Sequence, residues 1–540
     1  MVNCEMQNLN NKYNAVREID WKEEGHCISH NTHLKSVAIS DSGTMLLRSL
    51  TEEDFMNMAY FFDAVARNTS ITTFSFWSCD TLAQLMFLEL GPKFGGVNGL
   101  RKLSLVNMCH LDAAIDIKEF ASALEKCGDS GSTLEDVEIS CCSTRGDDEM
   151  SSDEAMCQLI NAFNKYCNLV RLEWAADSGD GMGNMAVQSL AQLINNPRCT
   201  LEEFSVCCKA ADPGPANELA RALSTNTTLK RLDLNESTLF GENEWISIFQ
   251  CFQRPGSELE SLCLSDVANV PAVLFNALSS NRTLKYIDLS FIEGISTNQW
   301  MSLATSLNNM PLEKLRLHGN QENDGGEEIE ASTINGEVVA SFATLLSNSS
   351  SLNTLDFGGN HDVGDGVVST FAAALTKNRT LSILALDQVY TIEEDDYSDI
   401  ITNVGWDAIT HALCDGSSID ATFNSNHVLE KVWGEWERRQ QNRLPKDLFD
   451  LLQLNASDMS KFDVAREKIL LTHFHKQTKS MKVFEDEMDL SVIPHAISWM
   501  LRANSDDDLG QTVLYWMLHS FPSLLSTSEK GRAVCMKRKR

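Results

Sequence analysis

The repeated pattern L-x-x-L-x-L constrains this chain more than any other feature of its sequence. A well-formed copy, Leu229–Leu234, follows a segment in which Leu219, Ala220 and Leu223 recur at helical spacing. The last three residues of the pattern alternate between apolar and polar side chains, as expected of a half-buried strand. One helix and one strand cannot bury both apolar faces alone, so the pattern predicts that copies stack on one another as a solenoid.

Copies of the pattern run along residues 1–433. Position 1 falls at Leu34, Ile71, Leu100, Leu134, Leu169, Leu201, Leu229, Leu259, Leu284, Leu312, Leu352 and Leu381. The first copy of the strand signature begins at Val16, and weaker copies begin at Ser418 and Leu429. Three polar insertions, residues 144–153, 321–336 and 391–404, lengthen single repeats, and we expect them to form exposed loops.

The repeat ends near Trp433, and residues 434–540 have a different pattern. Four segments of this part have helical periodicity: Leu444–Leu454, Val464–Phe474, Val492–Arg502 and Gly510–Leu525. A solenoid exposes an apolar face at its last repeat, so the simplest interpretation is an α-helical C-terminal cap or extension. The alternative is a separate effector module.

Charge divides the chain in the same way. Residues 434–540 hold 17 basic and 15 acidic residues, so the first 433 residues carry a net charge of −34 within a total of −32. Such a field repels nucleic acid and anionic membranes and favours a basic protein partner. The alternative is that the charge only keeps a large open surface soluble.

Several observations indicate a cytoplasmic protein. The 16 cysteines form no C-x-x-C pair, and we expect them to be reduced thiols. No apolar run reaches the length of a membrane span, and the first residues lack the basic and apolar regions of a signal peptide. The basic cluster Lys537–Arg540 leaves nuclear import open as an alternative.

The pattern resembles ribonuclease-inhibitor-type leucine-rich repeats, which also occur in NOD-like immune receptors. The resemblance implies an α/β horseshoe with a parallel concave sheet, convex helices and an Asn or Cys at position 9 that bonds to the turn backbone. Position 9 matches at Cys79, Cys142, Asn320 and Asn360, and departs at Met108, Lys209, Val267, Ile292 and Val389. The C-terminal part, with residues 417–432, resembles uncharacterised repeat proteins of microalgae, which implies no known activity.

Positions 3 and 5 of each strand should point away from the core and into the concave face. The resemblance places partner binding on that face, and exposed aromatic side chains there would be anchors. The candidate residues are Trp77, Asp136, Glu138, Arg171, Glu173, Glu203, Arg231, Asp233, Tyr286, Asp288, Lys314, Arg316 and Asp356. Because Asp at position 5 is ordinary in these repeats, the alternative is that Asp233, Asp288 and Asp356 are only solvated.

Three other motifs have ordinary structural explanations. Gly181–Ala186 fits G-x-G-x-x-A, which can indicate dinucleotide binding, but the next strand copy arrives on schedule and favours a glycine-rich turn of the repeat. His473 and His475 point apart on a helix, so we expect polar cap edges and no metal. Asn68, Asn226, Asn281, Asn348 and Asn378 begin N-x-[ST] sequences just before a strand, where we expect turn residues and no glycans.

The chain has no P-loop, no H-E-x-x-H, no G-x-S-x-G and no kinase motif set, so we expect no catalysis, cofactor, metal or small-molecule substrate. The leading hypothesis is a non-catalytic protein-protein interaction scaffold that binds a basic partner on its acidic concave face. One alternative is a GTPase-activating protein of the Ran-activator type, with Arg145 in the catalytic position. Another is a ligand-sensing receptor module that signals through the helical tail.

Overall fold

The twelve predicted repeats form a single sheet in a computed structural model of the chain. The model describes residues 20–40, 52–77, 99–106, 114–129, 133–140, 149–166, 168–175, 183–207, 213–237, 239–250, 256–267, 270–271, 273–292, 295–308, 310–319, 334–360, 364–386, 401–432 and 444–474. The 12-stranded sheet has the order β1 to β12, and each strand is parallel to its neighbours in sequence. This arrangement is an α/β leucine-rich-repeat solenoid, as predicted.

The strands fall into two groups of different length. The first six have five residues each: β1 Ser36–Ser40, β2 Thr73–Trp77, β3 Lys102–Val106, β4 Asp136–Ser140, β5 Arg171–Ala175 and β6 Glu203–Cys207. The last six have three residues each: β7 Arg231–Asp233, β8 Ser261–Cys263, β9 Tyr286–Asp288, β10 Lys314–Arg316, β11 Thr354–Asp356 and β12 Ile383–Ala385. Position 3 of each repeat pairs in register with position 3 of the next.

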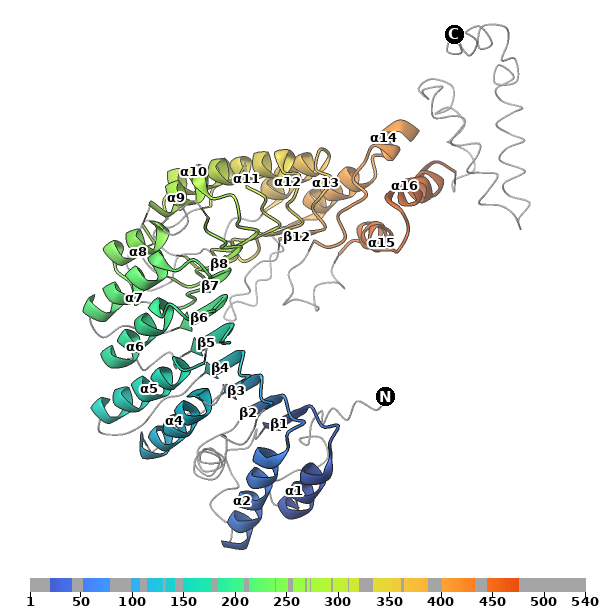
Figure 1. Cartoon of the computed structure of the whole chain (residues 1–540). Coiled ribbons are helices and arrows are strands. Elements are labelled where there is room, and N and C mark those ends of the chain that lie inside the picture. The colour runs from blue at the N-terminus through green and yellow to red at the C-terminus, as the bar shows by residue number, and fades with distance from the viewer. Residues whose placement is uncertain are drawn as a thin grey trace, which may run out of the picture.

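Helices cover the outer side of the arc, and the strands line its hollow side (Figure 1). They are α1 Trp21–His30, α2 Glu52–Arg67, α4 Ala114–Asp129, α5 Glu149–Phe163, α6 Asn184–Asn195, α7 Pro213–Thr225, α8 Glu242–Phe249, α9 Val273–Ser280, α10 Thr297–Leu307, α11 Gly336–Asn348, α12 Asp365–Leu375 and α13 Asn403–Leu413. The expected loop at 144–153 is wrong from Glu149 onward, where α5 begins. The loops at 321–336 and 391–404 lie mostly outside the described residues.

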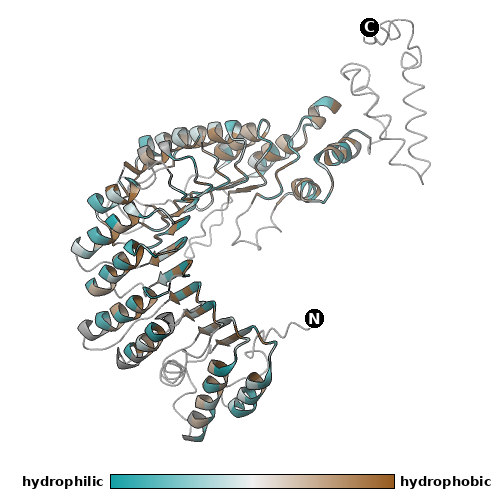
Figure 2. Cartoon of the chain, in the orientation of Figure 1, coloured by the Kyte–Doolittle hydropathy of each residue, from teal (hydrophilic) through white to brown (hydrophobic). Residues whose placement is uncertain are grey.

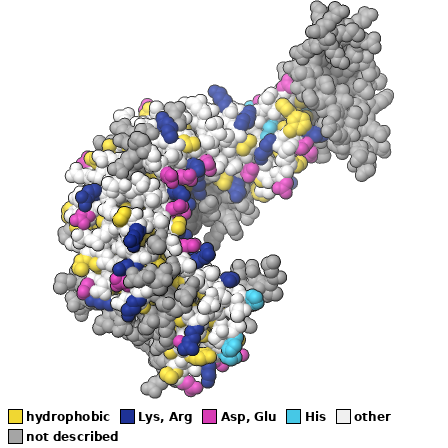
Figure 3. Space-filling model, viewed as in Figure 1, with side chains coloured by type: hydrophobic (Ala, Val, Ile, Leu, Met, Phe, Trp, Pro, Cys, Tyr) yellow, Lys and Arg dark blue, Asp and Glu magenta, His cyan; other side chains and the backbone are white. Residues whose placement is uncertain are grey.

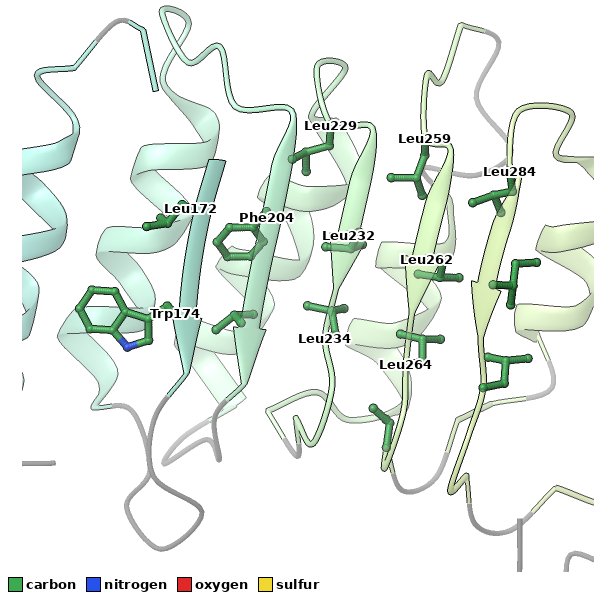
Figure 4. Packing of buried hydrophobic residues seen from close by; sticks show 14 of the residues in the cluster. Leu172, Trp174, Phe204, Leu229, Leu232, Leu234, Leu259, Leu262, Leu264 and Leu284 are labelled. Carbon is green, nitrogen blue, oxygen red and sulfur yellow. The ribbon is translucent and has the colours of Figure 1, made fainter. Parts of the chain in front are cut away.

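The leucines of the pattern form the core between sheet and helices. Leu229, Leu232 and Leu234 lie against the equivalent residues of the next repeat, Leu259, Leu262 and Leu264, and all six are at most 7% exposed (Figure 4). Apolar and polar residues alternate along the helices, as expected of elements with one buried side (Figure 2). Each repeat therefore buries its apolar face only against its neighbours.

The N-x-[ST] sequences form a hydrogen-bonded spine between repeats. Asn378 is 1% exposed, accepts from the backbone N–H groups of Thr380 and Leu381, and donates to the carbonyl of Leu346 in the preceding repeat. The Thr380 hydroxyl donates to the carbonyl of Leu352, just before the preceding strand β11. The same bonds to their own turns recur at Asn68, Asn226 and Asn281. The prediction that these asparagines are turn residues is confirmed for Asn68, Asn226, Asn281 and Asn378. It is wrong for Asn348, which is the exposed last residue of α11, while the Ser349 hydroxyl accepts from the N–H groups of Ser351 and Leu352 in its place.

The supposed anion site at the start of α6 is occupied by the side chain of Asp153, and Gly183 leaves room for that carboxylate. The two carboxylate oxygens of Asp153, in α5, accept from the N–H groups of Met185 and Ala186 at 2.9 Å each. A Cβ at Gly183 would collide with that carboxylate. A helix N-terminus attracts phosphate because its first N–H groups lack partners. Here two of them already have a carboxylate, so the structure favours the turn interpretation.

The weaker repeat copies at the C-terminal end of the array are not full strands. Residues 418–423, predicted as a strand, form α14 Ile419–Phe423, whose N-cap is the Ser418 hydroxyl. The copy at Leu429 contributes only an isolated bridge between Lys431 and Ile383. The copy at Val16 lies mostly outside the described residues, and its last residue, Trp21, begins α1.

Two helices after the repeats pack on the last repeat. They are α15 Lys446–Asn455 and α16 Lys461–Ile469, followed by the π-helical turn η7 Leu470–Phe474, as predicted for residues 444–474. His473 is 4% exposed and bonds to the Thr422 hydroxyl at 2.8 Å, so the expectation of a polar edge was wrong there. His475 and the predicted helices at 492–502 and 510–525 lie outside the described residues.

Candidate interaction face

The predicted face is the hollow side of the sheet, where acidic and basic side chains gather (Figure 3). Along β4 and β5 the residues at positions 3 and 5 are half-buried, and those between them are buried. The backbone of Trp77 ends β2, in register with Ser40 and Val106. The side chain of Trp77 lies outside the described part of the chain.

Position 3 of β3 to β7 carries a ladder of alternating charge. Asp136 lies 3.0 Å from Lys102 and 3.9 Å from Arg171. Glu203 lies 3.7 Å from Arg171 and 3.5 Å from Arg231. Opposite charges on neighbouring strands attract across the sheet, so this row compensates most of its own charge.

Position 5 extends the ladder at β4 and β5. Arg171 donates to Glu173 at 2.6 Å, and Glu138 accepts from the Ser104 hydroxyl at 3.0 Å. Partial burial lowers the pKa of Arg171, but the carboxylates of Asp136, Glu173 and Glu203 outweigh this effect and leave the pKa raised. The guanidinium is therefore held charged at the centre of the ladder.

A buried charge network replaces the ladder at β9 to β11. Arg316 lies between two aspartates, 3.5 Å from Asp288 and 3.3 Å from Asp356. Asp288 also accepts from the Tyr286 and Ser290 hydroxyls, at 2.9 and 2.6 Å. The two aspartates are 4% and 5% exposed, so the alternative that they are only solvated is wrong. Lys314 lies over the ring of Tyr286, 5.3 Å from its centre.

The pKa shifts of this network follow from its contacts. Burial raises the pKa of the Asp356 carboxyl, but His318, Arg316 and the Gly358 N–H outweigh it and leave that pKa below its usual value. Burial and the charge of Asp288 raise the pKa of Tyr286. Burial lowers the pKa of Arg316, and the neighbouring Asp288, Tyr286 and Asp356 raise it further than burial lowers it.

Asp233, on β7, lies at the border between ladder and network. Burial raises its pKa to about 6, and the nearby carboxylates of Glu173 and Asp288 act in the same direction. Its carboxylate accepts a hydrogen bond from the Asn235 N–H at 3.2 Å. The same bond from the residue two positions on reaches Asp288 and Asp356, so the position-5 aspartates also hold the turn that follows.

The turns after β7 to β11 each reach a left-handed residue at position 8. These residues are Glu236, Asp266, Phe291, Gly319 and Gly359, with φ between 52° and 68°. Each of the first four donates its N–H to the position-7 carbonyl of the next repeat, at 2.8–2.9 Å. These hydrogen bonds link the turns of neighbouring repeats in a row along the carboxyl ends of β7 to β10. We call this row the rim, and each position-8 residue in it a rung.

The residues at position 9 show why the turns are irregular. Asn360 is 3% exposed and donates to the carbonyls of Leu317 and Phe357, as the family pattern implies. Val267 and Ile292 place buried apolar side chains at that position. Cys79, Cys142 and Asn320 lie outside the described residues.

Metal sites and membrane spans are absent from the described part of the chain. No group of three or more His, Cys, Asp or Glu side chains among the described residues could hold a metal ion. Within those same residues no helix is both long and apolar enough to cross a membrane. Arg145 and the basic cluster 537–540 lie outside the described ranges, so the predictions that involve them remain predictions.

Comparisons with known proteins agree with the repeat class. No protein-family model matches the chain. The mouse protein "NACHT, LRR and PYD domains-containing protein 14" is 26% identical over 211 residues, which is 38% of this chain and 20% of that protein. The match thus spans about a fifth of the curated relative's length. The repeats, the sheet and this relative identify a leucine-rich-repeat protein.

Two solved structures are similar in outline. An internalin of Listeria monocytogenes has a TM-score of 0.32 and 11% identity, with coverage of 71% of this chain and 86% of the internalin. A chain of the yeast Rad7–Elc1 complex has a TM-score of 0.39 and 14% identity, with the same two coverages. Both TM-scores are below 0.5 and carry no conclusion about function.

Proposed function

We propose that this protein is a non-catalytic scaffold that binds a protein partner on its concave face. The observation that carries the proposal is the sheet itself, whose twelve strands present rows of side chains along the hollow side while helices cover the other side (Figure 1). An extended concave surface of this kind suits a protein surface better than a small molecule.

The charge of position 5 supports a basic partner. This row holds the acids Glu138, Glu173, Asp233, Asp288 and Asp356 against a single base, Arg316. Several of these acids are paired with Arg171 or Arg316, but positions 3 and 5 together hold seven acids against five bases, so the face keeps a net negative charge. The field of this charge speeds the encounter with a cationic surface and weakens with salt.

An affinity pull-down with the intact chain, washed at low and at high salt, tests this proposal. We expect a basic protein that is retained at low salt and lost at high salt. The matched variant is Glu138→Gln with Glu173→Gln, and the control is Asp447→Asn with Asp450→Asn on α15, outside the sheet. A partner set indifferent to salt, or one retained equally by the sheet variant, contradicts the basic-partner proposal.

We also infer that α15, α16 and η7 cap the solenoid. Lys468 is fully buried and donates to the carbonyls of Leu413 and Asn426, at 2.8 and 2.9 Å. Asn455 donates to the carbonyl of Leu429 at 2.6 Å. Removal of residues 434–540 should therefore expose the last repeat and cause aggregation. A truncated chain that stays monomeric and binds normally would instead support an effector role for this part.

A further inference from the structure

Phe291 is the most unusual residue of the rim at position 8. Its side chain is 46% exposed, and its φ of 54° lies in the left-handed region that residues with a Cβ avoid. The next two repeats place Gly319 and Gly359 at this position. A large apolar side chain is thus kept in solvent, at a backbone position where glycine would fit without strain.

The neighbouring glycines make room for the ring. A Cβ at Gly319 would collide with the Phe291 ring, and one at Gly359 would lie 2.7 Å from Nε2 of His318. The Phe291 ring and the His318 imidazole are 5.3 Å apart in an edge-to-face arrangement. The ring is therefore seated in a fixed position at the rim, which lowers the entropy cost of a contact with a partner.

The rungs before Phe291 carry carboxylates that differ from those of the sheet. Asp266 and Glu236 are both exposed. Elsewhere on this part of the sheet, Glu202 and Glu260 form ion pairs with Lys230 and Lys285, at 2.9 Å each. Within the described chain neither Asp266 nor Glu236 forms an ion pair, and Glu236 accepts a weak hydrogen bond from the Cys207 thiol at 3.8 Å.

We propose that Phe291, Asp266 and Glu236, here called the rim site, bind an arginine or lysine side chain of the partner. The cation lies over the exposed ring, which attracts it through the negative charge of the ring face, and Asp266 supplies a salt bridge. Arginine binds more tightly than lysine because its planar guanidinium also stacks on the ring. This inference rests on the proposed function and names the contact that a basic partner makes.

Fluorescence anisotropy with a labelled octa-arginine peptide at low salt tests the rim site in the full chain. We expect Phe291→Ala and Asp266→Asn to weaken binding by about three- to tenfold each, the range of one cation–π or charge-assisted contact. The matched controls are Phe462→Ala, whose ring is also 46% exposed, and Asp458→Asn, both remote from the sheet. Octa-lysine should bind more weakly than octa-arginine, and octa-glutamate should not bind.

Phe291→Gly separates a binding role from a structural one. Glycine relieves the left-handed backbone, so the melting temperature should stay the same or rise while affinity for octa-arginine falls. Wild-type affinity in Phe291→Ala and Asp266→Asn, with loss in Glu173→Gln, would overturn the rim site and leave the scaffold proposal standing. Equal binding of octa-arginine and octa-glutamate by the wild type would show that charge does not govern binding, and would overturn both the rim site and the basic-partner proposal.

Discussion

The concave face carries charge in two different ways on the two sides of β7. In the ladder of β3 to β7, the paired side chains are 25–56% exposed. In the network of β9 to β11, the side chain of Arg316 is 19% exposed, and the side chains of its two aspartate partners, taken without their backbone, are only 6% and 8% exposed. Exposed ion pairs contribute at most about 1 kcal/mol, whereas removal of one partner of a buried pair costs about 3–5 kcal/mol.

The comparison teaches that burial at position 5 follows the contacts of each side chain and not the length of its strand, because Asp233 on three-residue β7 is half-buried and Ser104 on five-residue β3 is buried. After the three-residue strands, the chain turns at once, and the N–H groups and hydroxyls of the turn reach the position-5 side chain. Ser290 covers Asp288 in this way, and Gly358 and His318 cover Asp356. In the five-residue strands β4 and β5 the equivalent Glu138 and Glu173 are half-buried and are held mainly by neighbouring side chains.

The largest effect should come from Arg316→Met. This variant leaves Asp288 and Asp356 without their shared cation in a buried site, and we expect it to destabilise the chain by about 3–5 kcal/mol. Urea unfolding and local hydrogen exchange in β9 to β11 measure the loss. The matched control is Arg171→Met in the ladder. Equal losses for the two variants would abolish the distinction between the two halves.

The second largest effect should be the change of folding stability with pH that the carboxyl of Asp233 causes. Its pKa is about 6 in the fold against 3.8 when unfolded, so the folded state binds more protons between these values. Stability should therefore fall as pH rises from about 4 to 6, by up to about 3 kcal/mol at 1.36 kcal/mol per pKa unit. Asp233→Asn removes this slope. Parallel stability curves of variant and wild type from pH 4 to 7 would contradict the assignment.

The third largest effect, the loss of stability when an asparagine of the spine is removed, should be the same on both sides of β7. Asn281→Ala removes the acceptor of two backbone N–H groups in a residue that is 2% exposed, and we expect a loss of about 2 kcal/mol. Asn68→Ala, in the first half, should lose as much because the spine continues through both. Asn243→Ala on the exposed start of α8 is the control. Thermal unfolding measures all three, and a loss confined to one half would show that the spine is discontinuous.

The smallest effect is expected for the ladder itself. Arg171→Met should cost less than about 1 kcal/mol, because its partners remain accessible to water. Chemical unfolding at low and at high ionic strength measures the loss, which should shrink further in salt because screening replaces the missing cation. A loss above about 2 kcal/mol that persists in high salt would show that the ion pairs of the ladder behave like those of the buried network, contrary to this prediction.

Much of the fold follows from local residue patterns. The apolar residues at positions 1, 4 and 6, most of them leucines, predicted every strand of the sheet, because each repeat needs the same apolar contacts. The strand predicted at residues 418–423 failed because Ser418 caps a helix there, a local bond that overrides the weak apolar pattern.

The sequence predicted which side chains lie on the candidate face, but not how deeply each one is buried or which groups it contacts. Alternation along a strand tells which side chains point outward, so positions 3 and 5 were found. Burial of Asp288 depends on Ser290 and on Arg316 of the next repeat, and no single-repeat pattern contains that information. Lys102 at position 3 and Phe291 at position 8 were missed as partners. The only signal for Phe291 was a large residue where later repeats have glycine.

The spine of asparagines also fixes an order of events during biosynthesis. The amide of Asn378 is sealed between two repeats, and the folded chain has no room for a sugar there. An enzyme that attaches glycans to N-x-[ST] would compete with stacking of the repeat for the same nitrogen while the chain is still extended. At Asn378, glycosylation and stacking of the repeat therefore exclude each other, whereas Asn348 is exposed at the end of α11 and is not subject to this competition.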